Sequence, residues 1–328
     1  MPAFLHRTRE VREAAETALA PAATRSAQSR GRARPEEPDP HRTAFERDRD
    51  RILHTKAFRR LKHKTQVFID PTGDHYVTRL THTLQVTQIA RALAAALGLN
   101  EALAEAIALG HDVGHSPFGH TGEEALSPYV EGGWHHAAQS VRIFEVLEDR
   151  NLTWEVRDGI RAHSWKIDPP PATPEAGCVR FADRIAYLSH DVLDAVRAGV
   201  LDQGDLPGAV RGHLGEPGSG WVDTMVRAVI DHSVATGALG MHPTTAGMMA
   251  ELRAFMFETV YHGPRTKAQR ATATQVVRDL VEHHLAHPEQ IPASYRDGAS
   301  DPVVQTVDYV AGMTDRYATA LHARLGSR

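Results

Sequence analysis

The sequence has few cysteines, no long apolar run and no recognisable secretory signal. Only one of its 328 residues is a cysteine, Cys178, which excludes an intramolecular disulfide framework and any multi-cysteine zinc or iron–sulfur site. No apolar run reaches the roughly 18 residues that a membrane-spanning helix needs. The N-terminus lacks the charged and then apolar segments of a secretory signal. These absences favour a protein of the reducing cytoplasm without a membrane partner.

The charge balance is also unremarkable, with 37 basic and 41 acidic residues and a net charge of -4. It gives no bulk electrostatic argument for binding nucleic acid or an anionic membrane. No basic stretch interleaved with aromatic residues supports single-stranded DNA binding. With 41% hydrophobic residues, the chain is long enough for one large core or two modest ones.

Histidine is the abundant residue type: there are 21 histidines against 9 Phe, 7 Tyr and 4 Trp. Its side chain is suited to proton transfer near neutral pH and to binding borderline metals. Composition alone does not place a histidine in a site. Three of them near the end of a polar helix, His283, His284 and His287, are expected at the surface.

Helical patterns dominate the chain after a less regular start. Residues 1–40 are expected to form a flexible N-terminal arm. Residues 41–328 are expected to form one helical catalytic domain with a C-terminal helical extension from about residue 221. Apolar residues at helical spacing, with Gly98 as a stop and Asn100 as a cap, predict two successive helices. Further helices are expected at 134–149, 151–164, 175–199, 222–238, 244–261, 265–287 and 301–326.

Strand signals are scarce, at 66–69 and 75–77 only, so the predicted fold class is all-α with a minor short β-hairpin. The Gly- and Pro-rich stretch 202–220 is expected to be a long loop. Thr121 followed by Glu124 matches a capping box, which predicts a helix that begins just past His120.

A histidine–aspartate dipeptide occurs twice, at His111-Asp112 and at His190-Asp191, so the bare dipeptide decides nothing. The first has the more telling context. Between His111 and Glu123 the chain gathers three histidines and two acids in thirteen positions broken by Gly and Pro. A polar loop with incidental histidines is the weaker interpretation. This stretch is therefore the first candidate for a site.

Two more candidates lie outside that stretch. His82 interrupts a well-patterned amphipathic helix, and Asp183 is an acid within an apolar one, which is costly to bury without a partner. Asp183, Tyr187 and Asp191 are spaced i, i+4, i+8 and share one helix face. That face is either the wall of a polar cavity or a solvated outer surface, and the spacing does not decide between them.

The set His82, His111-Asp112 and Asp183 resembles the H…HD…D signature of HD-domain metallophosphohydrolases. Longer motifs, spread from about Arg42 to the C-terminus, resemble the deoxyguanosine triphosphate triphosphohydrolase-like branch, the dNTP triphosphohydrolases. They include Arg47-Asp48-Arg49-Asp50-Arg51-Ile52, Ala57-Phe58-Arg59-Arg60-Leu61, Lys64-Thr65-Gln66-Val67-Phe68, Thr78-Arg79-Leu80-Thr81-His82-Thr83-Leu84 and Ala311-Gly312-Met313-Thr314-Asp315-Arg316-Tyr317.

The resemblance implies a set of site residues. It implies a divalent metal ion, one of Mn, Mg, Co, Ni or Fe, which suit such nitrogen and oxygen ligands, held by His82, His111, Asp112 and Asp183. It implies a catalytic cluster of His115, His120, Glu123 and His136. It implies substrate contacts from Arg79 and Arg184 to phosphate, and from Gln66, Tyr187 and Asp191 to the deoxyribose.

The implied reaction is hydrolysis of dGTP or several dNTPs to deoxynucleoside and inorganic tripolyphosphate. Water activated by the metal attacks the α-phosphorus, and His120, held by Glu123, protonates the departing 5′ oxygen. One motif departs from the family: where it reads Phe-Glu-His-Asn, this chain has Trp134-His135-His136-Ala137. The departure affects rate, pH optimum or substrate preference.

Two alternatives remain open. One is an HD nucleotidase or phosphodiesterase acting on other nucleotides, and the other is a catalytically weak nucleotide-sensing protein. Gln66, Tyr187 and Asp191 favour the triphosphohydrolase over the first. The complete metal and catalytic set favours an enzyme over the second. The family also implies a homo-oligomer, commonly a hexamer.

Overall fold

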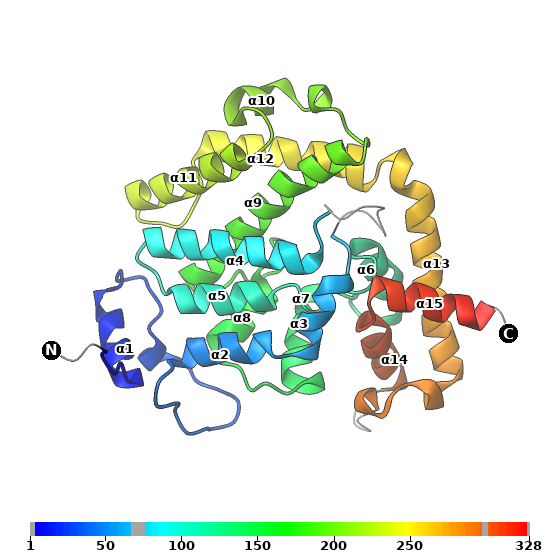
Figure 1. Ribbon diagram of the computed structural model, residues 1–328, viewed down its shortest axis with the longest axis horizontal. Coiled ribbons are helices and arrows are strands. Elements are labelled where there is room, and N and C mark those ends of the chain that lie inside the picture. Colours follow the sequence, from blue (N-terminus) through cyan, green and yellow to red (C-terminus); the bar gives the residue numbers. More distant parts are fainter. Residues whose placement is uncertain (1–3, 67–75, 297–300, 327–328) are drawn as a thin grey trace.

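The computed structural model describes residues 4–66, 76–296 and 301–326, and in these the chain is helical without a named strand (Figure 1). The α-helices are α1 (Arg9–Ala15), α2 (Ala44–Leu53), α3 (Lys56–Arg60), α4 (Arg79–Ala96), α5 (Glu101–Gly110), α6 (His120–Leu126), α7 (His136–Arg142), α8 (Trp154–Ala162), α9 (Pro174–Arg197), α10 (Gly208–Leu214), α11 (Ser219–Thr236), α12 (Pro243–Met256), α13 (Pro264–Ala286), α14 (Pro302–Ala311) and α15 (Asp315–Gly326). Short π-helical segments extend α7 (η5, Ile143–Leu147) and α12 (η7, Phe257–Tyr261).

The all-α prediction is therefore confirmed. The hairpin expected from 66–69 and 75–77 lies mostly outside the described residues. On its flanks, Thr65 and Thr78 form one isolated antiparallel bridge. None of the described helices is both long enough and apolar enough to cross a bilayer.

The main core is formed where α4 packs on α5 and α9, with α2 against α5 (Figure 1). Leu93, Leu103, Ile107 and Ile185 are fully buried in it. The turn between α4 and α5 follows the prediction, because the side chain of Asn100 accepts a hydrogen bond from the backbone N–H of Leu103 at 3.3 Å. This packing holds α4, the end of α5 and α9 in fixed positions around one cavity.

A second apolar cluster joins α6 to the C-terminal helices α13, α14 and α15. Leu126 of α6 packs there with Val277 and Val310. The helices α10–α12 instead bury Trp221 and Leu252 in the main core. The C-terminal extension expected from about residue 221 stays a prediction.

Four local expectations were wrong. The helix expected at 301–326 is two helices, α14 and α15, because the chain turns at Gly312 and the Asp315 side chain accepts hydrogen bonds from the backbone N–H groups of Thr65 and Phe118, each at 3.0 Å. The loop expected at 202–220 contains α10, whose Val210 and Leu214 are buried against the main core.

The third concerns the start of α6, which begins at His120 with Gly119 as its N-cap and without a side-chain cap from Thr121. Gly119 has φ +57°, and a Cβ there would lie 2.7 Å from a guanidinium nitrogen of Arg79. Close approach to Arg79 therefore sets this turn. Of the three histidines expected at the surface, His284 is buried, at 2% exposure, with its ring packed on that of Tyr309.

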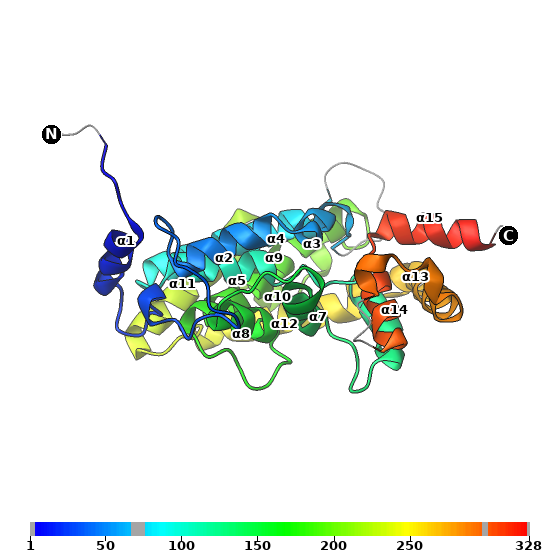
Figure 2. The same ribbon diagram turned by 90° about the horizontal axis from the view of Figure 1, so that it is seen from below.

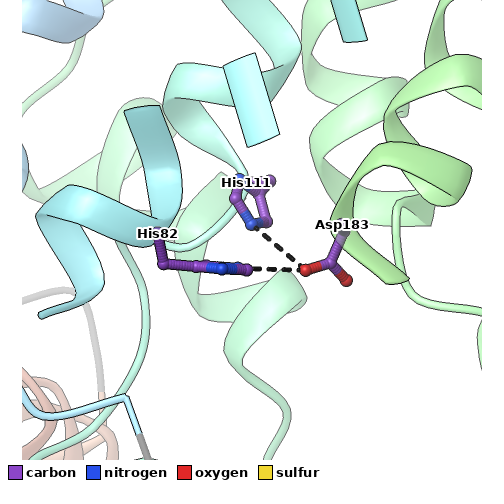
Figure 3. A group of neighbouring side chains, drawn as sticks. All are labelled: His82, His111 and Asp183. Atoms are coloured by element: carbon purple, nitrogen blue, oxygen red, sulfur yellow. Dashed lines mark hydrogen bonds and ion pairs between the residues drawn. The ribbon is translucent and has the colours of Figure 1, made fainter. Parts of the chain in front are cut away.

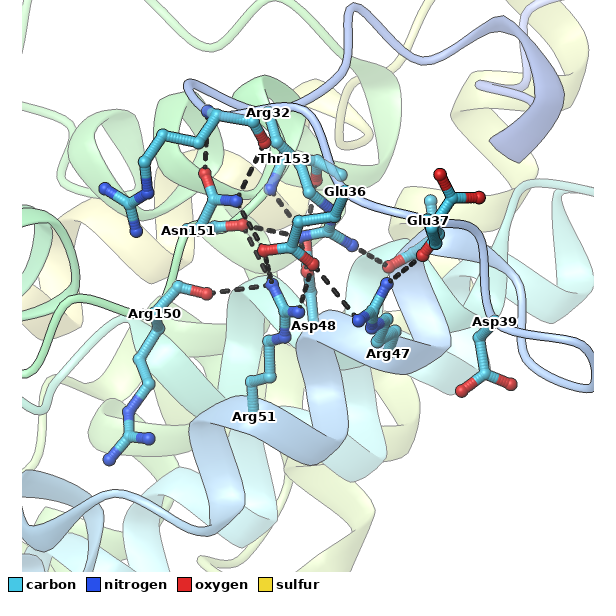
Figure 4. A network of polar contacts seen from close by, with 12 residues as sticks. Arg32, Glu36, Glu37, Asp39, Arg47, Asp48, Arg51, Arg150, Asn151 and Thr153 are labelled. Atoms are coloured by element: carbon cyan, nitrogen blue, oxygen red, sulfur yellow. Dashed lines mark hydrogen bonds and ion pairs between the residues drawn. The ribbon is translucent and has the colours of Figure 1, made fainter.

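The described part of the N-terminal arm, residues 4–40, lies along the helical body at the end opposite α15 (Figures 1 and 2). A group that we call the clasp fixes it there (Figure 4): Arg32, Glu36, Asp48, Arg51, Asn151 and Thr153. Arg32 forms an ion pair with Asp48, and Asp48 accepts two hydrogen bonds from Thr153, each at 2.7 Å. The mobility expected of this arm stays a prediction.

Candidate metal and active site

A cavity of about 420 Å³ opens between α4, α6, α9 and the η7 segment. Its lining contains predicted site residues that are up to more than 100 positions apart in the sequence. Lining it are Gln66, Arg79, His82, Asp112, His115, His120, Glu123, His136, Asp183, Arg184, Tyr187 and Asp191. His111 lies directly behind this wall and is fully buried. The structure therefore brings all the predicted site residues together.

His82, His111 and Asp183 converge at the inner end of the cavity (Figure 3). The Nε2 atoms of His82 and His111 lie 3.1 Å and 3.8 Å from Oδ1 of Asp183. Asp112 adds a carboxylate oxygen 3.6 Å from Nε2 of His111. The residues come from α4, the end of α5 and α9, so tertiary packing alone assembles this group.

The protein orients His111 as a metal ligand would need to be oriented. Its Nδ1 lies 2.6 Å from the carbonyl oxygen of Ala108 one turn earlier in α5, so Nδ1 donates and Nε2 keeps the lone pair. Nε2 is buried and has no hydrogen-bond partner within the described residues. Because a buried nitrogen without a partner costs free energy, these residues fit a bound cation.

The acids of this group favour the ionised form that metal binding requires. Burial raises the pKa of Asp183, but the hydrogen bond from His82 and the neighbouring His111 outweigh it and leave the pKa at about 2. Burial likewise opposes ionisation of Asp112, and His115 and Arg79 hold its pKa well below the ordinary range. Two carboxylates and two imidazoles are thus available as ligands.

Arg79 connects this group to the loop between α5 and α6. Its Nη1 donates to Oδ2 of Asp112 at 2.7 Å, and it is almost completely buried. His115 lies on the other side of Asp112, with its Nε2 3.2 Å from Oδ1. Burial, reinforced by Arg79, holds the pKa of His115 well below its usual value. His115 therefore lies beside the same carboxylate that pairs with Arg79.

Glu123 is surrounded by three imidazoles. Its Oε2 lies 2.9 Å from Nδ1 of His136 and 3.5 Å from Nδ1 of His120. His135 Nε2 lies 3.9 Å from Oε1. His136 is therefore the closer partner of Glu123, while the His120 side chain is 71% exposed at the cavity mouth.

The unusual Trp134-His135-His136-Ala137 segment is arranged around the start of α7. The Nδ1 atom of His135 accepts a hydrogen bond from the backbone N–H of Ala137 at 3.1 Å, so His135 caps the helix. Its ring stacks on that of His136 at 4.5 Å. Burial, with His136 beside it, lowers the pKa of His135 to about 4. In this chain His135 is a neutral packing and capping residue.

The stripe of Asp183, Tyr187 and Asp191 faces the cavity and not the outer surface. Asp191 is 3% exposed, and its Oδ2 accepts a hydrogen bond from the hydroxyl of Tyr261 at 2.6 Å. Burial raises the pKa of Asp191 to about 7. Gln66 lies on the same cavity wall with a buried side-chain oxygen that has no partner among the described residues.

Several residues of this cavity were not predicted from the sequence. His163 is 1% exposed, and its Nε2 lies 3.1 Å from Nε2 of His136. Lys166 and Arg253 also line the cavity. Residues 163–166 follow the end of α8. The one sequence feature that could have indicated His163 is its place at a helix end, which it shares with His111. Arg253 has no such feature, because only the packing of α12 brings it here.

Comparison with known proteins gives a consistent result. The HD domain family matches residues 79–188 and the phosphohydrolase-associated domain family matches residues 239–324. Solved structures with a similar fold include a phosphohydrolase from Bacteroides thetaiotaomicron (TM-score 0.52, 19% identity, 83% of this chain and 67% of that chain) and a hypothetical protein from Aquifex aeolicus (TM-score 0.50, 18% identity, 86% and 68%).

Sequence relatives are considerably closer. A deoxyguanosinetriphosphate triphosphohydrolase-like protein of Caldanaerobacter subterraneus is 48% identical over 95% of this chain and 94% of its own length. One of Clostridium perfringens is 44% identical over 90% of both chains. One of Cereibacter sphaeroides is 38% identical over 94% of this chain and 99% of its own.

Proposed function

The chain belongs to the deoxyguanosinetriphosphate triphosphohydrolase-like family of HD-domain phosphohydrolases, and from this premise we propose that it hydrolyses deoxynucleoside triphosphates. In the proposed reaction, water adds to the α-phosphorus and the bond from that phosphorus to the 5′ oxygen breaks. The products are a deoxynucleoside and inorganic tripolyphosphate. A divalent metal ion held by His82, His111, Asp112 and Asp183 would supply Lewis acidity and lower the pKa of the attacking water.

One observation carries the proposal: the cavity holds a metal-ligand group and, on the same lining, cationic side chains without an acidic partner. Among the described residues, no carboxylate forms an ion pair with Arg184, Arg253 or Lys166. Burial lowers the pKa of Arg184, with Arg253 contributing. Cations without an ion-pair partner at a cavity wall favour an anionic ligand of several charges, as a triphosphate is.

The remaining wall suits the sugar. Tyr187 and Asp191 present a hydroxyl and a carboxyl group. Gln66 presents an amide whose oxygen has no partner in the described part of the chain. Such groups discriminate by hydrogen bonding to ribose hydroxyls. In the proposal, Arg79 and Arg184 neutralise phosphate oxygens. His120, the exposed imidazole at the mouth, protonates the departing 5′ oxygen.

The test is a product assay. The purified protein is incubated with each of the four dNTPs and with Mn, Mg, Co, Ni or Fe ions, and the phosphate products are separated by anion exchange. We expect tripolyphosphate and deoxynucleoside in equal amounts, with ¹⁸O from labelled water in the tripolyphosphate. Release of orthophosphate or pyrophosphate alone would instead support the nucleotidase or phosphodiesterase interpretation. Nucleotide binding without turnover under all metals would support a sensing protein.

A further inference from the structure

The turn between α14 and α15 contacts residues of the cavity wall, although the proposed reaction gives it no role. Asp315, the first residue of α15, is buried. Its Oδ2 accepts hydrogen bonds from the backbone N–H and the hydroxyl of Thr65, at 3.0 Å and 2.5 Å. Its Oδ1 accepts one from the backbone N–H of Phe118 at 3.0 Å. One carboxyl group thus joins the segment that leads to Gln66 and the loop between α5 and α6.

Lys64 makes a second connection among the same three segments. Its side chain is buried, and its Nζ donates to the carbonyl oxygen of His115 and, at 3.2 Å, to that of Ala311. His115 lies in the loop between α5 and α6, and Ala311 is the last residue of α14. Every two of the three segments are therefore hydrogen-bonded to each other. We call Lys64, Thr65 and Asp315 the latch.

Phe118 is held in a backbone conformation that a large side chain rarely adopts. Its φ is +62°, and that of Gly119 is +57°. In this left-handed region the Cβ of a residue other than glycine crowds the backbone carbonyl oxygen, so neighbouring groups must hold the residue there. Asp315 holds the backbone N–H of Phe118, and its ring lies in the second apolar cluster with Val310 and Met313. The α14–α15 region therefore maintains the turn at Phe118.

The turn at Gly119 sets the relative positions of two groups of the proposed reaction. His120 follows Gly119 directly, and a Cβ at Gly119 would lie 2.7 Å from a guanidinium nitrogen of Arg79. The backbone N–H of Arg79 donates to the carbonyl oxygen of Lys64 at 3.1 Å. Lys64 therefore holds the backbone of Arg79, while Asp315 holds the loop that leads to His120.

We propose that Lys64 and Asp315 are positioning residues, which hold the loop before His120 against Arg79 and so fix the proton donor relative to the phosphates. The inference rests on the proposed function, because that function gives His120 and Arg79 their roles. Neither Lys64 nor Asp315 lines the cavity. Placement of a reacting group affects the rate steeply, since a displacement of about 1 Å can cost about 100-fold. The C-terminal helices thus act on the chemistry through the latch without contacting the substrate.

Replacing Asp315 tests the latch in turnover. Asp315→Ala removes both acceptor oxygens, and Asp315→Asn keeps one oxygen in a side chain of the same size. We expect kcat to fall about 100-fold in D315A and about tenfold in D315N. KM should change less than kcat, because Arg79 keeps its ion pair with Asp112. A D315A protein with the kcat of wild type, or one in which only KM changes, would overturn the proposal.

Asp48 provides a matched control for general loss of stability. It is a buried carboxylate that accepts the backbone N–H and the hydroxyl of Thr153, as Asp315 does with Thr65. Asp48→Ala therefore breaks the same kind of contacts in the clasp. We expect its kcat per folded molecule to stay within about twofold of wild type. If D48A lost as much kcat as D315A, the effect would be one of stability and the proposal would fail.

A double variant tests whether Lys64 and Asp315 act on the same loop. Lys64→Met keeps most of the length of the side chain and removes its donor, so K64M alone should also lower kcat. We expect the loss in K64M/D315A to be much smaller than the product of the two single losses, because the loop is already released in either variant. Losses that multiply would show two independent effects and contradict the latch.

Hydrogen exchange tests the same assignment without turnover. Mass spectrometry should show faster exchange of residues 115–123 in D315A, because the N–H of Phe118 loses its acceptor, and no change there in D48A. Each variant is measured at a temperature where it is folded. Unchanged exchange in D315A would overturn the inference even if dNTP hydrolysis is found. If exchange rises but the wild type hydrolyses no dNTP, the proposed function fails and the assignment of the latch to this loop remains.

Discussion

The cavity and the clasp are built from similar polar groups, but the protein satisfies them to different degrees. In the clasp, Asp48 has no exposed surface and accepts hydrogen bonds from Arg32 and from the backbone and hydroxyl of Thr153. In the cavity, the buried atoms His111 Nε2, His115 Nδ1, Gln66 Oε1 and Arg184 Nε have no partner among the described residues. The buried carboxylate of the clasp thus has partners within the protein, whereas several buried polar atoms of the cavity have none among the described residues.

The difference helps to distinguish polar residues that stabilise the fold from polar residues that bind a ligand. A buried polar atom without a partner costs roughly 1–3 kcal/mol, so a group of them in one place is a loss of stability that the rest of the fold must offset. A bound ion or ligand can supply the missing partners of such a group. Among the described residues, the region with such atoms coincides with the proposed metal and triphosphate positions, while the clasp fastens the arm.

The largest expected effect is on the cavity side. Replacing Asp183 by Ala removes the carboxylate that His82 and His111 both approach. We expect the bound metal to be lost and kcat to fall by more than about 1,000-fold. Elemental analysis and the tripolyphosphate assay measure these. Asp149→Ala, at an exposed carboxylate paired with Arg34, is the control and should change neither. A D183A protein that keeps both metal and activity would refute the ligand assignment.

The matching change in the clasp should act on stability and not on chemistry. Asp48→Ala leaves Arg32 without its ion-pair partner and leaves the Thr153 donors unsatisfied. Breaking such a buried pair costs about 3–5 kcal/mol of unfolding free energy. Urea denaturation measures this loss, and kcat per folded molecule should stay within about twofold of wild type. If D48A lost activity while its stability stayed unchanged, the division of roles between the two regions would be wrong.

Asp191, in the cavity, should make the free energy of unfolding depend on pH. Burial raises its pKa to about 7, above the 3.8 of an ordinary aspartate, so its ionisation destabilises the folded state. Wild-type stability should therefore fall as pH rises between about 4 and 7. The Asp191→Asn variant lacks that charge. Its advantage in unfolding free energy should grow across the window to a few kcal/mol, roughly 1.4 kcal/mol per unit of pKa shift.

Thermal or urea unfolding at pH 4, 6 and 8 measures that advantage. Activity provides the contrast, since Asp191 is proposed to contact the sugar and D191N should bind dNTPs less well. A variant no more stable than wild type at pH 8 would show that Asp191 is not a strained group.

The smallest expected effect concerns the unpaired cations. Arg184 lies over the ring of Trp165 at 4.4 Å and has no acidic partner among the described residues. We expect Arg184→Ala to raise KM for dNTPs about 10- to 100-fold, as loss of a charged hydrogen bond does, with little change in stability. Arg34→Ala, at an exposed ion pair in the arm, should leave KM unchanged. Equal KM values in R184A and wild type would remove Arg184 from the substrate site.

The helical fold could be predicted from the sequence because its signals are local, whereas the full set of site residues was implied by the family resemblance. Leucines at helical spacing, Asn100 as a cap and the i, i+4, i+8 stripe of α9 each depend on neighbours within a few turns. Every residue that the family resemblance implied for the site either lines the cavity or, like His111, lies directly behind its wall. The roles of these residues remain proposals.

The misses share a physical cause, which is contact between distant segments. The turn between α14 and α15 depends on Asp315 meeting Thr65 and Phe118. The start of α6 depends on Arg79 lying against Gly119. His284 is buried because α14 brings Tyr309 to it. No sequence window contains both partners of any of these contacts.

The sequence by itself determined which chemical groups this protein has and on which helix faces they stand, because those follow from residue type and helical period. Only the tertiary structure decided which of them are satisfied. The same ion-pairing residue types have partners within the protein in the clasp, whereas in the cavity several of them have none among the described residues. Whether a buried charge or lone pair meets a partner depends on packing between segments more than a hundred residues apart.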